Sequence, residues 1–281
     1  MTEQQWERLM RSADITRSIE TLMQTSILLI GCGALGSATA CHLASCRIGS
    51  LHLVDKDTVS EANLPHSPLF RQTDIGKRKV RVTAAFLRRK FPHLSVTTTP
   101  RFIQQCQQTI YEACDLIVCL PDNDQTRLWV NYYAVKYKKP TLFVGLGGPG
   151  DEWSGYLYFY LPPQSGCFAC FRHGGAGGPH QEQAVPRTND LEADRQRCGG
   201  ENIKVPVLAP VVGLIASLAA TTVIKHFLAM PVPTYTSLNA KLPLFTTTPI
   251  QPIPTCTVCG NKAEYDLETV LASHKGGSEN E

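Results

Sequence analysis

Strand-like and helix-like patterns of apolar residues follow one another along the first half of this chain. The strand patterns occupy residues 26–30, 51–54, 95–99, 115–120 and 141–146. The helical patterns between them occupy residues 34–47, 77–91 and 125–138. Several of the strands are apolar throughout, which is typical of a parallel sheet with both faces covered. The alternation predicts an α/β fold with a doubly wound, Rossmann-like, mostly parallel sheet.

The pattern changes after residue 150. A single aromatic strand is expected at residues 155–161, and the glycine-rich polar stretch at 174–200 has no clear period. Irregular stretches of this length are commonly functional or disordered. A helix is expected from residue 207, followed within residues 235–250 by two short strands with a turn between them. The second half therefore predicts a strand-containing extension of the sheet.

The turn at residues 31–36 reads Gly-Cys-Gly-Ala-Leu-Gly and lies between a strand and a helix. Gly31 allows the tight turn, Gly33 lets the backbone approach a phosphate, and Gly36 lets helix and strand pack closely. The helix N-terminus offers free N–H groups to phosphate oxygens. Asp55 ends the second strand about twenty residues further on, where a ribose-hydroxyl ligand is expected. These features predict a nucleotide site; the alternative is a tight turn with no ligand.

Two Cys-x-x-Cys pairs, Cys167/Cys170 and Cys256/Cys259, have the spacing of metal-binding knuckles. Four thiolates make the closed tetrahedral set of a structural zinc site, provided that the fold brings the distant pairs together. Zinc would then staple the end of the chain to its middle. Two unrelated pairs of buried thiols, or redox motifs, are the alternatives. No helix is expected to open at Cys167, which disfavours thioredoxin-like chemistry.

Composition limits the class of protein. The chain has 281 residues, of which 43% are hydrophobic, enough for one large domain. Its net charge of +3 favours no polyanion, so no nucleic-acid partner is expected. Residues 205–230 are apolar, but two prolines near their start and Lys225 and His226 near their end favour a buried core helix over a membrane span. Eleven cysteines without a signal-peptide pattern predict a reducing, cytoplasmic location.

From about Arg8 to Gly260, the sequence resembles the ThiF/MoeB/HesA family, bacterial relatives of ubiquitin-activating enzymes. The resemblance rests on residues 31–36, Val-Asp-Lys-Asp-Thr-Val at 54–59, Asn63-Leu64, Asp-Ile-Gly-Lys-Arg-Lys at 74–79, Asp122-Asn123, the long helix at 207–225 and both cysteine pairs. It implies a homodimer with structural zinc. It also implies adenylation, with Mg-ATP, of the C-terminal glycine of a small ubiquitin-like or sulfur-carrier protein.

The resemblance also implies roles for individual residues. Asp55 would bind the ribose, and Asn63 and Lys79 would contact the triphosphate. Asp122 would hold Mg²⁺ or position the phosphates, and Arg11 would reach a phosphate across the dimer. Asp57 joins the nucleotide-binding set, with a helix or turn cap as its alternative role. Gly31, Gly33 and Gly36 complete this set.

These roles agree with the chemistry of adenylation. A carboxylate attacks the α-phosphate and pyrophosphate leaves, so catalysis needs cations on the developing charge and a fixed geometry rather than a strong base. Lys79 lies in a basic helical segment with Lys77, Arg78 and Arg81. We expect Arg78 and Arg81 to belong to a solvated face and Lys79 to be the functional cation.

One departure from the family concerns the segment after Asn63. Relatives usually follow Asn-Leu with Gln-Arg-Gln, whose arginine binds phosphate, whereas this chain has His66 at the position of the arginine. Histidine is mostly neutral at pH 7 and cannot make a two-pronged phosphate contact. Three explanations stay open: Arg71 compensates, the rate is lower, or the substrate is atypical. A non-catalytic member of the family is a fourth.

Cys198 lies in the loop where some relatives carry an acyl-accepting cysteine. Arg195 and Arg197 would lower its pKa if they lie close in space, and a free surface cysteine is the alternative. His173 and His180 are expected to be solvated loop residues. The remaining cysteines are expected to be small core residues: Cys32, Cys41, Cys46, Cys106, Cys114 and Cys119.

Three classes of function follow. The first is an adenylating enzyme acting on a small partner protein, or on a peptide or tRNA-bound carboxylate. The second is an NAD-dependent oxidoreductase, which explains the glycines and Asp55 but not Lys79 or the cysteine pairs. The third is a non-catalytic scaffold for a ubiquitin-like protein. The expected parts are a helical lead-in at 1–25, a nucleotide-binding part at 26–150, a zinc- and partner-binding part at 151–260 with a crossover loop at 174–205, and a tail at 261–281.

Overall fold

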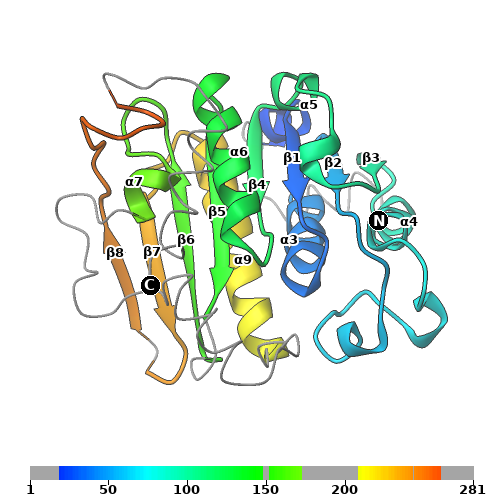
Figure 1. Ribbon diagram of the computed structural model, residues 1–281. Coiled ribbons are helices and arrows are strands. Elements are labelled where there is room, and N and C mark those ends of the chain that lie inside the picture. The colour runs from blue at the N-terminus through cyan, green and yellow to red at the C-terminus, as the bar shows by residue number, and fades with distance from the viewer. Residues whose placement is uncertain (1–18, 148–151, 173–207, 243, 261–281) are drawn as a thin grey trace, which may run out of the picture.

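A single eight-stranded sheet runs through the protein (Figure 1). The computed structural model describes residues 19–147, 152–172, 208–242 and 244–260. The strands are β1 (Ser26–Ile30), β2 (Ser50–Val54), β3 (Ser95–Thr99), β4 (Leu116–Cys119), β5 (Thr141–Leu146), β6 (Ser154–Tyr160), β7 (Tyr235–Asn239) and β8 (Leu244–Thr248). Their order is β3-β2-β1-β4-β5-β6-β7-β8, parallel from β3 to β5 and antiparallel from β5 to β8.

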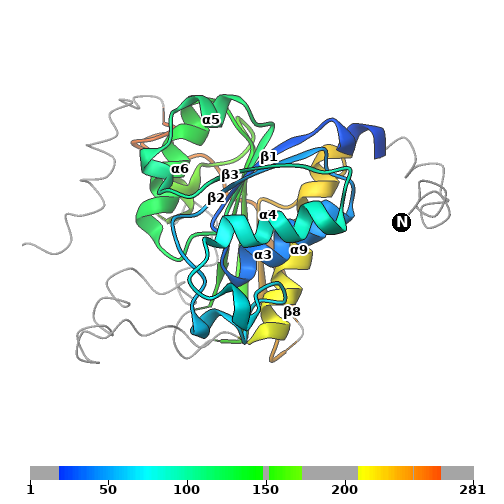
Figure 2. The same ribbon diagram turned by 90° about the vertical axis from the view of Figure 1, so that its right-hand side faces the viewer.

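Helices cover both faces of the sheet, as the two views show (Figures 1 and 2). One face carries α3 (Ala34–Ser45), α4 (Lys79–Lys90) and α9 (Ala209–Phe227). The other carries α5 (Thr109–Glu112), α6 (Asp124–Lys136) and α7 (Phe168–Arg172). Three short 3₁₀ helices are η1 (Glu61–Asn63), η2 (Gln72–Asp74) and η3 (Ile103–Gln105), and residues 19–23, before β1, are also helical. This arrangement confirms the doubly wound fold, and β6 to β8 form the expected C-terminal extension of the same sheet.

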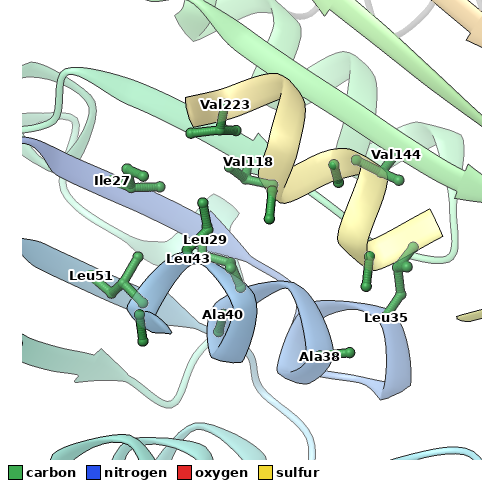
Figure 3. Close-up of a cluster of buried hydrophobic side chains, with 14 of the residues drawn as sticks. Ile27, Leu29, Leu35, Ala38, Ala40, Leu43, Leu51, Val118, Val144 and Val223 are labelled. Carbon is green, nitrogen blue, oxygen red and sulfur yellow. The ribbon is translucent and has the colours of Figure 1, made fainter. Parts of the chain in front are cut away.

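The alternation of side chains along β1 explains the two cores. Ile27 and Leu29 face the helices α3 and α9, whereas Leu28 and Ile30 belong to the cluster beneath α6. Figure 3 shows the first core, where Leu35 and Leu43 of α3 point toward the apolar side chains of the sheet. All of these residues are buried, so β1 needs apolar residues at its last four positions, on both faces of the sheet.

Helix α9 packs within the first core. By length and composition, it is the one helix in the described residues that could cross a membrane, a test that core helices of water-soluble folds also pass. Its residues Val212, Ile215, Ala219 and Val223 are buried against α3 and the sheet. This placement agrees with the core helix expected from the sequence. The division of the chain into four functional parts stays a prediction.

Candidate functional site

The sheet has its topological switch point at β1: the chain continues from β1 to β2 on one side, and β4 lies on the other side of β1. In open α/β sheets, ligands bind outside the carboxyl ends of the strands at such a point. A pocket with a volume of about 160 Å³ lies there, within the segments that follow β1, β2, β3 and β4. This is smaller than the roughly 300–1,000 Å³ of most ligand pockets, so a nucleotide would extend beyond it along the open edge. Six predicted residues line the pocket: Gly31, Gly33, Asp55, Asp57, Lys79 and Asp122.

The glycine turn has the geometry that its sequence predicts. Gly31 has a φ of +95°, and a Cβ there would lie 2.8 Å from the carbonyl oxygen of Leu120. A Cβ on Gly36 would lie only 1.8 Å from the Gly31 oxygen, so the helix and the turn are in direct contact. A Cβ on Gly33 would meet nothing within 4 Å. The turn is therefore closed on the protein side and open where a phosphate would approach.

We expect Gly36→Ala to destabilise the protein and Gly33→Ala to leave its stability unchanged. The added methyl group at Gly36 forces the turn apart, an overpacking cost of roughly 1–3 kcal/mol. This corresponds to a fall in Tm of roughly 2–12 °C for a chain of this size, measurable by scanning calorimetry. Gly33→Ala is the matched control, since Gly33 has a φ of −70° that alanine also adopts. Equal Tm values for the two variants would contradict the close approach of Gly36 to Gly31.

Asp55 fixes the glycine turn to the end of β2. One carboxylate oxygen accepts a 2.6 Å hydrogen bond from the backbone N–H of Cys32, and the other accepts a 2.7 Å bond from that of Asp57. Each oxygen has a second lone pair, so a ribose hydroxyl could still donate to this carboxylate. Asp55 therefore organises the glycine turn and lines the pocket, while its ribose role stays a prediction.

Asp57 and Lys79 form an ion pair beside the glycine turn, with a Nζ–Oδ2 distance of 3.1 Å. The segment that carries Asp57 runs antiparallel to the start of α4, and the backbone N–H of Lys79 donates to the Asp57 carbonyl. Lys56 also contacts Asp57, at 2.8 Å. Partial burial opposes ionisation of Asp57, but its contacts with Lys56 and Lys79 outweigh this effect and lower its pKa. Asp57 is thus an ionic partner of two lysines rather than a helix cap.

Burial separates Lys79 from its basic neighbours. Its side chain is 11% exposed, whereas Arg78 and Arg81 are exposed residues. Helix α4 begins at Lys79 because Arg78 has an extended backbone, two residues later than the sequence predicts. The structure therefore confirms the solvated face at Arg78 and Arg81, whereas the functional role of Lys79 stays a prediction.

Asp122 and Asn123 follow β4 and line the same pocket. Asn123 caps α6, accepting a 2.8 Å hydrogen bond from the backbone N–H of Thr126, and its amide nitrogen donates to Asp122 at 3.1 Å. Asp122 is exposed, so its carboxylate can take a cation from solution.

Asn63 does not line this pocket. Its side-chain oxygen accepts hydrogen bonds from the backbone N–H and the hydroxyl of Ser60, both at 3.0 Å, and so caps η1. The same loop continues through His66 to Ser67, whose hydroxyl lies 3.1 Å from that of Ser37 in the first turn of α3. The loop therefore lies beside the glycine turn, with the Asn63 oxygen engaged locally. Its proposed triphosphate contact stays a prediction.

Arg71 does not line the pocket either. It is exposed, and its backbone N–H donates to Asp74 at the start of η2. Within the part of the chain that the structure describes, Arg71 has no contact that would compensate for His66, so this explanation also stays a prediction.

The pocket includes a wall that the sequence reasoning missed, formed by residues 101–104 after β3. Phe102 is 46% exposed there, and the Lys56 nitrogen lies 4.8 Å from the centre of its ring. An exposed aromatic face in a nucleotide pocket can stack on a flat ring. The signal was available, since the carboxyl end of the third parallel strand must meet the same edge of the sheet as Asp55.

A larger cavity, with a volume of about 810 Å³, lies against the starts of β1, β2 and β3. It contains none of the residues predicted for the nucleotide site. Its most distinctive side chain, His52, is hydrogen-bonded to the hydroxyls of Thr97 and Thr99. The smaller pocket at the glycine turn is therefore the candidate nucleotide site.

The two cysteine pairs meet beside the middle of α6, where Asn131 contacts the Cys167 sulfur. The sulfurs of Cys167 and Cys256 are 3.7 Å apart, those of Cys170 and Cys259 are 3.4 Å apart, and all four lie within 4.8 Å of one another. Four thiolates around a tetrahedral zinc at Zn–S ≈ 2.3 Å have S–S distances of about 3.8 Å, whereas a disulfide needs about 2.05 Å. The cluster therefore fits a Cys₄ metal site and contains no disulfide.

The electrostatics of the cluster also favour a cation. Hydrogen bonding from Cys167 lowers the pKa of Cys170 to about 7, whereas burial raises the pKa of Cys167. Four thiolates this close repel one another strongly unless a metal ion neutralises them. The backbone N–H groups of Ile253 and Val258 also point at cluster sulfurs, at 3.4 Å each.

One expectation about the cysteines was wrong. A short helix, α7, does begin directly after Cys167, because the chain turns back there to pack Phe168 into the core. The expected absence of a helix at Cys167 therefore no longer disfavours thioredoxin-like chemistry. The metal interpretation rests instead on the second pair of sulfurs within reach of the first.

The remaining cysteines divide into two groups. Cys32, Cys114 and Cys119 are buried, as expected of core residues, whereas Cys41, Cys46 and Cys106 are only partly buried. Arg11, Cys198, His173 and His180 lie outside the described residues, so their roles stay predictions.

Comparison with known proteins identifies the family in which this arrangement occurs. The model of the ThiF family matches residues 7–260. The chain belongs to the ThiF family. This ThiF-family chain is 27% identical over 277 residues to ubiquitin-like modifier-activating enzyme 5 of Bombyx mori, covering 93% of this chain and 66% of that protein. It is 27% identical over 208 residues to the sulfur carrier protein ThiS adenylyltransferase of Escherichia coli, covering 73% of each.

A third relative matches more closely over a shorter stretch. The Nedd8-activating enzyme E1 catalytic subunit of Drosophila melanogaster is 37% identical over 153 residues, which are 51% of this chain and 34% of that protein. The ThiF-family chain thus spans from about a third to two thirds of the length of these two eukaryotic relatives.

Solved structures share the fold. Escherichia coli MccB with MccA-N7isoASN superposes with a TM-score of 0.71 at 23% identity, covering 87% of this chain and 70% of that chain. PaaA superposes with a TM-score of 0.68 at 18% identity, covering 89% and 84%. At these identities the likeness shows the ThiF-type fold alone.

Proposed function

We propose that this protein catalyses the ATP-dependent adenylation of the C-terminal carboxylate of a small ubiquitin-like or sulfur-carrier protein. One observation carries the proposal: Lys79, Asp55, Asp57 and Asp122 converge on the open side of the glycine turn, at the switch point of the sheet. Membership of the ThiF family supports it, as do relatives named as ubiquitin-like modifier-activating enzymes and adenylyltransferases.

The arrangement suits attack on a phosphate. The partner's carboxylate attacks the α-phosphorus of ATP, the bond to the bridging oxygen breaks, and pyrophosphate leaves. Negative charge develops on the phosphoryl oxygens, and the Lys79 ammonium and the N-terminal N–H groups of α3 would stabilise it. Asp55 orients the ribose, and Gly33 leaves room for the phosphates.

Two metals belong to the proposal. Asp122 would hold Mg²⁺, which neutralises charge on the triphosphate. Cys167, Cys170, Cys256 and Cys259 would hold Zn²⁺, a closed site with no position left for a substrate. The zinc is thus assigned to structure and not to the reaction.

Further parts of the proposal concern residues outside the described ones. A homodimer would bring Arg11 of one protomer to the phosphates of its partner. Cys198 would accept the acyl group after adenylation. A cytoplasmic location agrees with eleven cysteines, four of them assigned to zinc.

A second candidate is a non-catalytic scaffold that binds a ubiquitin-like protein. His66 favours it, since this side chain stands where relatives have the phosphate-binding arginine; the described arginine that lines the pocket, Arg101, comes from the segment after β3 instead. A third candidate is adenylation of a peptide carboxylate, which the fold shared with MccB keeps open. Neither candidate predicts ATP–pyrophosphate exchange that depends on a carrier protein, whereas the main proposal does.

ATP–pyrophosphate exchange tests the proposal directly. We expect radiolabel from pyrophosphate to enter ATP only when a small carrier protein ending in Gly-Gly is present. The matched control is the same carrier without its last glycine, which should support no exchange. Exchange with a peptide carboxylate, and none with the carrier protein, would replace the main proposal by the third candidate. Carrier binding with no exchange would establish the scaffold.

A further inference from the structure

An ion-paired triad connects the two sites across α6 and α7, which lie side by side on one face of the sheet (Figure 1). The Asp124 carboxylate accepts from Arg127 at 2.9 Å and from Arg172 at 3.1 Å. The three side chains are only 11%, 16% and 18% exposed, in the order Arg127, Asp124, Arg172. Charges this poorly solvated depend on one another, because a buried ion that loses its partner is costly. We call these three residues the ion triad.

One end of the ion triad holds the wall of the nucleotide pocket. Arg127 donates from Nη2 to the Pro121 carbonyl at 2.7 Å and to that of Val144 at 3.4 Å. Pro121 lines the pocket and directly precedes Asp122. Burial alone would lower the pKa of Arg127, but Tyr156 and Asp124 more than compensate and raise it. The guanidinium is therefore a permanent cation that fixes the segment carrying Asp122.

The other end of the ion triad is attached to the cysteine cluster. Arg172 ends α7, the helix that begins after Cys167 and contains Cys170. A second contact lies one turn along α6 from Arg127, at the fully buried Asn131. Its oxygen accepts from the Phe168 backbone N–H at 2.7 Å, and its nitrogen lies 3.5 Å from the Cys167 sulfur. The position of α7 on α6 is therefore set jointly by the cluster, Asn131 and the ion triad.

We propose that metal occupancy of the four-cysteine cluster and nucleotide binding are energetically coupled through the ion triad, with Arg172 as the positioning residue. A bound metal holds α7 in place, which keeps Arg172 on Asp124 and leaves Arg127 directed at Pro121. Loss of the metal frees α7, removes Arg172 from Asp124 and loosens the segment that carries Asp122. The inference rests on the proposed function only in requiring that this pocket binds ATP.

The coupling has a thermodynamic signature that a merely stabilising metal lacks. If zinc strengthens nucleotide binding by some factor, the nucleotide must strengthen zinc binding by the same factor. Couplings between sites commonly amount to about 5- to 150-fold. We expect about tenfold here, because one ion triad and one loop are involved.

The test uses the full chain and isothermal titration calorimetry with a non-hydrolysable ATP analogue. We expect the zinc-loaded protein to bind the analogue about tenfold more tightly than the metal-depleted protein. A chelator competition should show zinc affinity rising by the same factor in the presence of the analogue. Arg172→Gln, loaded with zinc, should bind the analogue about as weakly as the depleted wild type and respond no further to zinc removal. Arg89→Gln, an exposed arginine on α4, is the control and should behave as wild type.

Each result decides a separate point. Equal analogue affinity with and without zinc overturns the coupling and leaves the proposed function intact. Coupling that persists in Arg172→Gln overturns the route through the ion triad. No analogue binding in any form overturns the proposed nucleotide site itself. Circular dichroism will show whether the metal-depleted protein unfolds. If it does, zinc-loaded Arg172→Gln still tests the inference, because binding of the ATP analogue with wild-type affinity in this variant would contradict it.

Discussion

Lys79→Met is expected to lower kcat/KM for ATP–pyrophosphate exchange by about 10²- to 10³-fold. The variant keeps the length of the buried stem and removes only the charge. Loss of one preorganised group that stabilises developing charge in a partly desolvated site typically has an effect of this size. The lysine is 11% exposed and lies 3.1 Å from Asp57, so solvent cannot replace it readily. Asp57 keeps its second partner, Lys56, which limits the damage to the fold.

The matched control is Arg81→Met, the same kind of substitution two residues further along α4. Arg81 is exposed, so we expect a change in exchange rate of less than about twofold, since exposed charges contribute little. Tm should be similar for the two variants. A normal exchange rate for Lys79→Met at normal Tm would remove Lys79 from the catalytic assignment. A similar loss in both variants would point to the general basicity of α4 instead.

Much of this site follows from the sequence because its elements are local. A strand, a glycine turn and a helix specify one another within about twenty residues, and an acidic residue at the end of the next strand must lie beside them. The contacts of Gly31, Gly36 and Asp55 at the turn therefore follow from the sequence, whereas their roles toward a nucleotide stay predictions. The burial of Lys79 could also have been predicted from the sequence, since helical periodicity puts Lys79 and Val80 inward and Arg81 outward.

The rest depended on contacts between distant segments. The wall at Phe102 follows β3 and faces segments that follow other strands, and the ion triad joins α6 to α7. No periodicity within one segment encodes such contacts. The sequence spacing of Asn63 suggested a ligand contact, but its oxygen is used locally to cap a turn. Short polar side chains commonly make such local bonds. The helix after Cys167 was missed for a similar reason, since five residues are too few to show a period.

Cys256→Ser is expected to abolish tight zinc binding and to lower Tm by roughly 10 °C. A serine hydroxyl stays protonated at neutral pH and replaces a thiolate poorly, so the closed set of four ligands is broken. Structural zinc contributes about 10–16 kcal/mol in isolated fingers, but here a large core remains folded, and a loss of roughly 3–5 kcal/mol corresponds to this fall in Tm. Metal analysis and scanning calorimetry measure the two effects.

The large fall in Tm is expected because few contacts besides the metal attach the segment after β8 to the rest of the protein. After β8, the backbone is fixed to the middle of the chain by few direct contacts, among them the bond from the Gly166 N–H to the Ile250 carbonyl at 3.0 Å. Val258 is the buried apolar residue between Cys256 and Cys259. Without the metal, the knuckle has too little apolar surface to stay closed, so residues 251–260 should gain rapid amide exchange first.

Cys106→Ser is the control, since Cys106 is a partly buried thiol outside the cluster. It should retain about one zinc per chain and nearly wild-type Tm. A chelator should lower the Tm of wild type and of Cys106→Ser alike, and should leave that of Cys256→Ser unchanged, because its metal is already gone. If the chelator removes zinc from the wild type without changing its Tm, the zinc does not staple the fold. Full zinc content in Cys256→Ser would show instead that three thiolates suffice.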